Sequence, residues 1–415
     1  MRRSLYVGLR CVGCGSEFGR GERVLTCTAC GSELDAIYDH GRAGAFFRGV
    51  RRSPVGSIWD FGPMMPVTRE EAVVSLGEGW TPLLKAERLG RRIGIPKLLL
   101  KDETRNPTLS FKDRAISVAV SKAVEWKKEV LVTASTGNLA AAVSAYAARA
   151  GLKAFILTAA STPLVKRIQT AAYGTTVVPV RGATTDNARA LAGELVKERG
   201  WYPAMTHSTA NPFTLEGAKT AAYEIFYQMG GRFPDWVMVG VGGGENLAGH
   251  WKGFRELRPD GEAEGLPRLV GVQGRECAPF VEAVAKNLSY EELKPWKGAH
   301  TIASGLADAY PADARLALRA VRESRGTGVA VSDAELLEGV GLMAREAGVF
   351  AEPSGAAGLA AAIRLREDGV IDGSDQVVCS VTGSGLKQYE EFSATLRIGR
   401  PIRGELRAFE RAYPA

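Results

Sequence analysis

Short apolar runs that alternate with helical stretches constrain the fold of this chain more than any other feature. The alternation begins near residue 75 and continues for about 300 residues. The expected strands cover residues 97–100, 130–133, 154–157, 176–180, 236–239, 269–272 and 376–381. The expected helices cover residues 139–150, 186–198, 215–228, 246–256, 333–347 and 356–367. This order predicts an α/β protein whose parallel sheets are covered by helices on both faces.

Length and composition limit the function classes that remain. A chain of 415 residues is too long for one ordinary core, and 45% hydrophobic with 24% charged residues is a globular composition, not a disordered one. The net charge of +7 is spread along the chain with few aromatic residues nearby, so we expect no nucleic-acid partner. We also expect no membrane partner and a cytoplasmic location, because neither a membrane-length apolar run nor a secretory signal pattern is visible.

Four cysteines near the N-terminus form two CxxC pairs, each followed by glycine: Cys11 with Cys14, and Cys27 with Cys30. Paired CxxC knuckles of this spacing predict a zinc ribbon over residues 1–40, because four thiolates complete a tetrahedral zinc site. Such a site leaves no open position for catalysis. A ribbon without metal and a pair of disulfides are the alternatives. Residues 41–74 lack periodicity and are expected to form a connector that wraps the main body.

Three small, glycine-rich loops follow expected strands and open the next helix, at residues 133–138, 240–246 and 382–386. In parallel sheets, ligands bind beyond the carboxyl ends of the strands. Gly242, Gly243 and Gly244 can present successive backbone N–H groups at a helix N-terminus, which favours a phosphate group. The dinucleotide pattern GxGxxG with its distant acidic residue is absent, as is the triphosphate pattern GxxxxGK[ST].

Residues 106–114 add a lysine, Lys112, to these loops. A helix is expected to start here with Ser110 as its N-cap. A lysine that faces a phosphate-binding loop can form a Schiff base with an aldehyde cofactor. The alternative is an ordinary capped helix with Lys112, Asp113 and Arg114 on its solvated face.

The motifs at residues 110–114, 135–138, 242–246, 352–356 and 382–387 occur in an order that resembles fold-type II pyridoxal-phosphate enzymes, and most of all threonine synthases. Residues 75–83, residues 211–219 and the cysteine ribbon are similar to that family too. The resemblance implies a tryptophan synthase β-like fold with two parallel-sheet α/β domains. The large, cofactor-binding domain would comprise residues 75–104 and 211–415, and the small domain residues 105–210. It also implies a homodimer.

The resemblance assigns a role to each motif. Lys112 would hold pyridoxal 5'-phosphate and then act as general base and acid. Asn138 would contact the phenolic oxygen of the cofactor, and Thr382 its pyridine nitrogen, where a neutral hydroxyl suits elimination and replacement chemistry. The cofactor phosphate would lie against Gly242, Gly243, Gly244, Glu245 and Asn246. The substrate carboxylate would lie against the backbone of Ser135, Thr136 and Gly137.

The substrate is less well indicated than the cofactor. Threonine synthases convert O-phosphohomoserine and water to threonine and phosphate, usually with an arginine where this chain has Thr214 and often with a threonine where it has Leu139. The loss of these groups weakens phosphate binding unless other donors compensate. The candidates are Lys166, Arg167, Ser208 and Thr209.

We therefore expect a lyase of the threonine synthase type that acts on an amino acid with a phosphorylated side chain. Residues 301–306 resemble the corresponding segment of serine and threonine ammonia-lyases, which is the first alternative. A phosphoserine-using β-replacement synthase, such as a cysteate synthase, is the second. A catalytically silent scaffold is disfavoured by the presence of Lys112.

Overall fold

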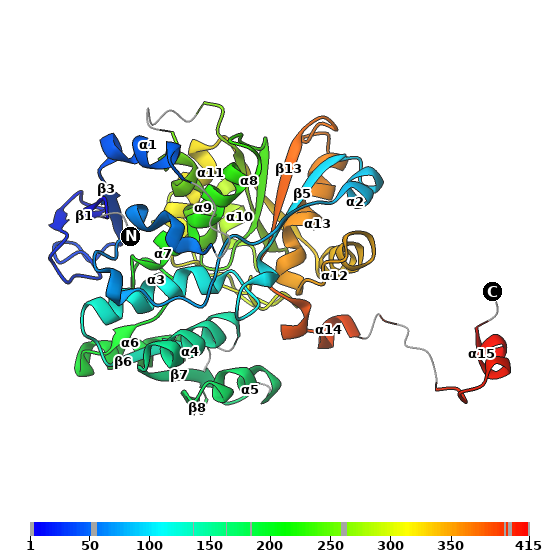
Figure 1. Ribbon diagram of the computed structural model, residues 1–415, viewed down its shortest axis with the longest axis horizontal. Helices are drawn as coiled ribbons and strands as arrows, with labels where there is room; N and C mark the ends of the chain where they lie inside the picture. Colours follow the sequence, from blue (N-terminus) through cyan, green and yellow to red (C-terminus); the bar gives the residue numbers. More distant parts are fainter. Residues whose placement is uncertain are drawn as a thin grey trace.

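The computed structural model of the protein describes residues 4–50, 56–135, 137–162, 164–182, 185–258, 264–393, 396 and 401–413. Over these residues the chain forms a six-stranded sheet, a four-stranded sheet and a three-stranded sheet. Figure 1 shows the three-stranded sheet at one side of the molecule, with the strands and helices of the four-stranded sheet below the main body. Among the described helices, none combines the length and the apolar character needed to cross a bilayer.

The six-stranded sheet has the order β12-β11-β10-β13-β5-β4, and all neighbours are parallel except β4 and β5. Its strands are β4 (Leu83–Lys85), β5 (Lys97–Asp102), β10 (Trp236–Gly240), β11 (Arg268–Gly274), β12 (Thr327–Val331) and β13 (Gln376–Val381). Side chains of β10 alternate between two apolar clusters, with Val237 and Val239 in one and Trp236 and Met238 in the other. The sheet is therefore buried on both faces, as the alternation of strands and helices predicts.

Each face of this sheet is covered by its own set of helices. The first face packs against α8 (Thr220–Gln228), α9 (Glu245–Glu256), α10 (Pro279–Ala285) and α11 (Ala314–Glu323). The second face packs against α2 (Glu87–Arg92), α12 (Asp333–Leu342) and α13 (Pro353–Glu367).

The four-stranded sheet is parallel throughout, with the order β8-β7-β6-β9. Its strands are β6 (Val130–Ala134), β7 (Lys153–Ala159), β8 (Thr176–Val180) and β9 (Tyr202–Pro203). Its helices are α3 (Lys112–Glu125), α4 (Asn138–Ala150), α5 (Leu164–Ala172) and α6 (Thr185–Arg199). Ala188 and Ala192 of α6 pack against Val132 and Leu157 on one face, while α3 and α4 contribute to the cluster on the other.

The N-terminal region forms an antiparallel sheet of β1 (Tyr6–Cys11), β2 (Glu17–Gly19) and β3 (Leu34–Tyr38) in the order β2-β1-β3. The following connector contains helix α1 (His40–Arg48) and the 3₁₀ turns η1 (Ile58–Met64) and η2 (Glu70–Ala72). Ile58, Phe61 and Met64 are fully buried, so the connector contributes to the core.

The expected strands all form, with boundaries that shift by three residues or fewer. Two of the expected helices form over the expected residues but differ in detail. Residues 215–228 are not one helix but α7 (Thr214–Ala218) followed by α8, and the helix expected at 333–347 becomes a π-helical turn, η4 (Met343–Ala347), at its end. The sequence analysis also did not predict β4 and β12 of the six-stranded sheet or β9 of the four-stranded sheet. The remaining elements are the 3₁₀ turns η3 (Glu103–Arg105) and η5 (Gly385–Lys387) and the C-terminal helices α14 (Glu390–Ser393) and α15 (Leu406–Ala412).

Candidate active site

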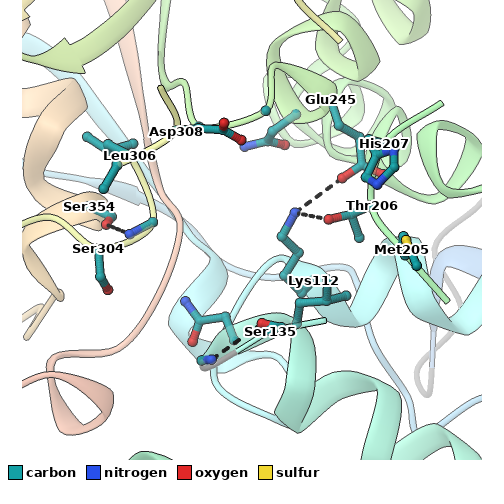
Figure 2. Close-up of a pocket in the computed structure, with 18 of the residues that line it drawn as sticks. Lys112, Ser135, Met205, Thr206, His207, Glu245, Ser304, Leu306, Asp308 and Ser354 are labelled. Carbon is teal, nitrogen blue, oxygen red and sulfur yellow. Dashed lines mark hydrogen bonds and ion pairs between the residues drawn. The ribbon is translucent and has the colours of Figure 1, made fainter. Parts of the chain in front are cut away.

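A cavity of about 1120 Å³ lies at the carboxyl ends of β6, β10 and β13. The three glycine-rich loops identified in the sequence all contribute to its wall, as do Lys112, residue 203, residues 205–207 and residues 209–210. Figure 2 shows Lys112 pointing into this space, with Ser304, Leu306 and Ser354 on the opposite side. The arrangement agrees with the rule that parallel sheets bind ligands beyond their carboxyl ends.

Lys112 is the first residue of α3, and its side chain is 18% exposed. Its Nζ donates a hydrogen bond to Thr206 Oγ1 at 2.7 Å and lies 3.3 Å from Glu245 Oε2 (Figure 2). The amine is therefore held between a hydroxyl and a carboxylate at the mouth of the glycine loop that joins β10 to α9.

The start of α3 differs from the expectation in two ways. Ser110 is not the N-cap, because no side-chain bond caps this helix and Ser110 Oγ is buried without a hydrogen-bond partner. The start is fixed instead by Asp113, whose carboxylate accepts from Thr108 N and Thr108 Oγ1, both at 2.8 Å. Asp113 and Arg114 are buried, which excludes the solvated face considered as the alternative for this segment.

The loop after β10 has the features of a phosphate cradle. Gly244 has a φ of 105°, and a Cβ atom at Gly242 would lie 2.3 Å from the carbonyl oxygen of Gly305. Only glycine therefore fits these two positions without strain. Asn246 Nδ2 is buried and has no hydrogen-bond partner, so it is a donor that an anion at the α9 N-terminus would satisfy. These residues fit the phosphate of pyridoxal 5'-phosphate.

Asn138 and Thr382 also line the cavity. Asn138 Nδ2 donates to Glu352 Oε1 at 2.8 Å, which orients the amide at the start of α4. Thr382 is buried, and its carbonyl oxygen accepts from Phe111 N at 3.0 Å, next to Lys112. Two motifs more than 200 residues apart in sequence are thus brought to the same lysine.

The predicted carboxylate-binding loop lies on the same wall. Ser135 and Gly137 line the cavity, and Gly137 N donates to Ser135 Oγ at 3.4 Å. Thr136, which belongs to the same prediction, lies outside the described residues.

Residues 205–210 carry several of the polar groups near Lys112. Ser208 N donates to Asp313 Oδ1 at 2.7 Å, while Ser208 Oγ, Asp313 Oδ2 and Glu245 Oε1 are buried without hydrogen-bond partners. Burial, reinforced by the charge of Glu245, raises the pKa of Asp313 to about 8. Burial, together with the charges of Arg189 and Lys112, lowers the pKa of His207 to about 4. His207, which lines the cavity, thus carries a neutral imidazole at neutral pH, while the carboxyl group of Asp313 is buried behind the wall.

The candidates for phosphate recognition are distributed unevenly. Thr209 lines the cavity, and Ser208 is buried beside it. The side chain of Lys166 lies outside the described residues, and Arg167 Nε is buried without a hydrogen-bond partner. Thr214 is also buried, and its Oγ1 donates to Asn211 O at 3.0 Å, so this hydroxyl is used within the chain.

Sequence reasoning missed Thr206, Asp313, Glu352 and Arg189 as site residues. Arg189 Nη2 lies 3.3 Å from Asp308 Oδ2 on the cavity wall. This ion pair joins α6 to the 299–308 segment. Glu352 is the first residue of the 352–356 motif, so the sequence could have indicated it as a site residue. Thr206 and Asp313 had no local sequence signal, because their contacts depend on tertiary structure.

The four N-terminal cysteines converge, and their sulfur atoms all lie within 4.8 Å of one another. Cys11 Sγ is 3.4 Å from Cys30 Sγ, and Cys14 Sγ is 3.7 Å from Cys27 Sγ. None of the described cysteines is in a disulfide, so that alternative is not formed. Such a set of four sulfur atoms fits a tetrahedral zinc ion.

Comparisons with known proteins agree with this geometry. Residues 74–383 match the family model described as pyridoxal-phosphate dependent enzyme. The threonine synthase of Methanocaldococcus jannaschii is 38% identical over 381 residues, which are 91% of this chain and 92% of that protein. The threonine synthase of Methanosarcina acetivorans is 37% identical over 380 residues, with the same coverage of both chains.

Among solved structures, the processed threonine deaminase isoform 2 of Solanum lycopersicum superposes with a TM-score of 0.64 and 25% identity. The superposition covers 76% of this chain and 84% of that one. The parallel sheets, the lysine at the glycine loop and these relatives lead to one conclusion. The chain belongs to the family of pyridoxal-phosphate dependent enzymes and is a threonine synthase-like lyase.

Proposed function

We propose that this enzyme converts O-phosphohomoserine and water to threonine and phosphate, with Lys112 as the residue that binds the cofactor and transfers protons. The observation that carries the proposal is the position of Lys112 Nζ beside Thr206 and Glu245, at the mouth of the glycine loop. Relatives named threonine synthase that match over 91% of the chain support the same reaction.

The cofactor, when bound, supplies an electron sink that makes protons near the substrate's amino group acidic. The backbone of Gly242, Gly243 and Gly244, together with Glu245 and Asn246, would hold its phosphate. Asn138 would donate to its phenolic oxygen and Thr382 would face its pyridine nitrogen. A neutral hydroxyl at this nitrogen does not stabilise a positive charge there, which favours elimination and replacement over transamination.

Lys112 is the general base and acid in this proposal. Its Nζ is within hydrogen-bond reach of Thr206 Oγ1 and close to Glu245 Oε2, which orient the amine and can stabilise its protonated form. The same amine can therefore remove a proton at one carbon and return it at another without help from bulk water.

The substrate would be recognised at both ends. Backbone N–H groups of Ser135, Thr136 and Gly137 would hold its carboxylate, since this loop opens α4. Ser208, Thr209 and Lys166 would contact the side-chain phosphate in place of the arginine that the family carries at the position of Thr214.

A panel of amino acids, scored for phosphate and ammonia release, tests the reaction. Phosphate and threonine from O-phosphohomoserine are the expected products. Ammonia and a keto acid from free serine or threonine would support an ammonia-lyase instead, which the similarity to a threonine deaminase structure makes the second candidate. Phosphate release from O-phosphoserine only with sulfite would indicate a cysteate synthase. Either of these results, without turnover of O-phosphohomoserine, would contradict the proposal.

We further propose that the enzyme acts in the cytoplasm as a homodimer. Size-exclusion chromatography with light scattering should give twice the chain mass of 44.3 kDa. A mass of one chain at micromolar concentration would contradict the dimer.

A further inference from the structure

The cysteine ribbon contributes directly to the wall of the active-site cavity. Leu25 and Thr26, which immediately precede Cys27 in the second CxxC knuckle, line the same cavity as Lys112. Thr26 Oγ1 donates a hydrogen bond of 3.0 Å to the carbonyl oxygen of Thr209, which is 183 residues away in sequence. A segment that looks like a separate appendage in the sequence thus contacts the catalytic region.

The contacted segment, residues 205–210, is the part of the cavity wall closest to the reactive amine. Thr206 accepts a hydrogen bond from Lys112, and Ser208 and Thr209 are the proposed ligands of the substrate phosphate. Within the segment, Ala210 N donates to His207 O at 3.0 Å, and Ser208 N is tied to Asp313. The Thr26 hydrogen bond fixes the segment from the ribbon side.

The position of Thr26 depends in turn on the cysteine cluster. Its neighbour Cys27 is buried. The carbonyl oxygen of Cys27 accepts a hydrogen bond of 2.9 Å from Gly31 N, which closes a turn of the chain. At its other end the ribbon is anchored to the body by Glu33, whose Oε1 lies 2.9 Å from Arg315 Nε. A metal ion held by the four sulfurs would therefore fix the knuckle tip, while its loss leaves that tip held by weaker contacts.

We propose that Thr26 is a positioning residue for the 205–210 segment, and that a metal ion bound by Cys11, Cys14, Cys27 and Cys30 controls substrate affinity through this hydrogen bond. The inference rests on the proposed function, since it assigns the segment to substrate binding. It gives the ribbon a role in the active site as well as in the fold.

The kinetic test uses the holoenzyme and three variants. Thr26→Val keeps the size of the side chain but removes the donor, and the KM for O-phosphohomoserine should rise by about 3- to 10-fold, which is the effect of one lost hydrogen bond. The kcat should change by less than about twofold, because Thr26 bonds the segment at Thr209 and not at Thr206, which contacts Lys112. Thr26→Ser should restore the KM. Thr28→Val is the matched control, because Thr28 directly follows Cys27 in the same knuckle and is exposed.

The structural test does not depend on the substrate. Amide hydrogen exchange of peptides covering residues 205–211 should become faster in Thr26→Val, and in wild-type protein after zinc is removed by a chelator, but not in Thr28→Val. Metal analysis should find one zinc ion per chain before chelation, and the cofactor absorption should stay the same throughout.

The two tests separate failure of the inference from failure of the proposed function. If O-phosphohomoserine is not turned over but exchange changes as described, the positioning role stands and the substrate assignment is wrong. If exchange and KM are the same in Thr26→Val as in wild type, or if Thr28→Val has an equal effect, the positioning role is wrong. If the purified, active enzyme has no metal in the ribbon, the proposal that a metal ion controls substrate affinity is wrong.

Discussion

Two oxygen atoms from distant parts of the chain orient the reactive amine of Lys112. Thr206 comes from the segment after β9, and Glu245 from the start of α9, so each contact requires a different strand–loop–helix unit to be in place. At the scale of single residues, the proposed reaction therefore depends on how these two contacts hold the nitrogen of Lys112.

Replacing Lys112 by alanine should remove catalysis and leave the fold intact. The variant loses the amine that we propose binds the cofactor covalently and transfers protons, so we expect turnover to fall by at least about 10³-fold. The visible absorption of the bound cofactor should shift to that of a non-covalent complex, as measured by spectroscopy of the purified protein. Lys153→Ala, at an exposed position, is the control and should behave as wild type. Normal turnover by the Lys112 variant would refute the assigned role.

Asp313 should make the stability of the protein depend on pH. Its pKa of about 8 in the folded protein lies above the ordinary value of 3.8, so the folded state keeps a proton that the unfolded state releases. Between about pH 4 and pH 8 this group therefore lowers the free energy of unfolding as the pH rises.

Asp313→Asn removes this proton linkage but keeps an acceptor for Ser208 N. In the cofactor-free protein it should raise the free energy of unfolding at pH 8 by about 1–3 kcal/mol, with a smaller gain at pH 5. Urea unfolding at both pH values measures the difference, and Asp368→Asn on the exposed end of α13 should have no effect. An equal change at both pH values would show that the carboxyl group does not titrate in this range.

At the scale of elements, a buried ion network ties the start of α3 to the six-stranded sheet. Arg114 donates to Glu103 after β5 at 2.7 Å and to Glu224 of α8 at 2.8 Å. Lys101 of β5 also contacts Glu224, at 2.6 Å. All four side chains are almost completely inaccessible to solvent, so each charge depends on its partners. The network fixes the helix that carries Lys112 against the sheet that carries the glycine loop.

Arg114→Met should therefore destabilise the protein by about 3–5 kcal/mol, because it leaves Glu103 and Glu224 with an uncompensated buried charge. Arg10→Met, which breaks an exposed pair with Glu17, is the matched control and should cost at most about 1 kcal/mol. Chemical denaturation of the two variants gives both values. If they lose similar free energy, burial does not strengthen this network as argued.

At the scale of the whole molecule, the ribbon is held to the body by polar contacts as well as by packing. Tyr38 OH donates to Glu216 Oε2 at 2.6 Å, and Lys252 Nζ lies 2.8 Å from Glu216 Oε1 while also contacting Asp35. The ribbon is thus an integral part of the folded chain.

We expect the four-cysteine site to hold zinc, and removal of this zinc should accordingly lower the stability of the whole protein. Structural zinc sites contribute folding free energy directly, so treatment with a chelator should decrease the Tm by at least about 5 °C. The Tm should recover on addition of zinc. Cys277→Ser, outside the cluster, should respond to the chelator as the wild type does. An unchanged Tm in protein shown to have lost its metal would contradict a structural role.

The sequence determined the class of fold and the motifs of the site. Parallel strands buried on both faces need short, continuous apolar runs, and the helices between them need a different period, so a strand such as β13 could be located to the residue. Glycines that permit close backbone approach are likewise visible in sequence, as at Gly242. The domain boundaries remain a prediction.

Tertiary structure alone decided which groups meet at the lysine. Thr206 and Asp313 carry no local pattern, Ser110 is not the cap that its residue type suggested, and Thr26 of the ribbon reaches Thr209. The physical reason is range: periodicity and capping act over a few residues, whereas these contacts join segments up to 183 residues apart and exist only when the sheets are packed.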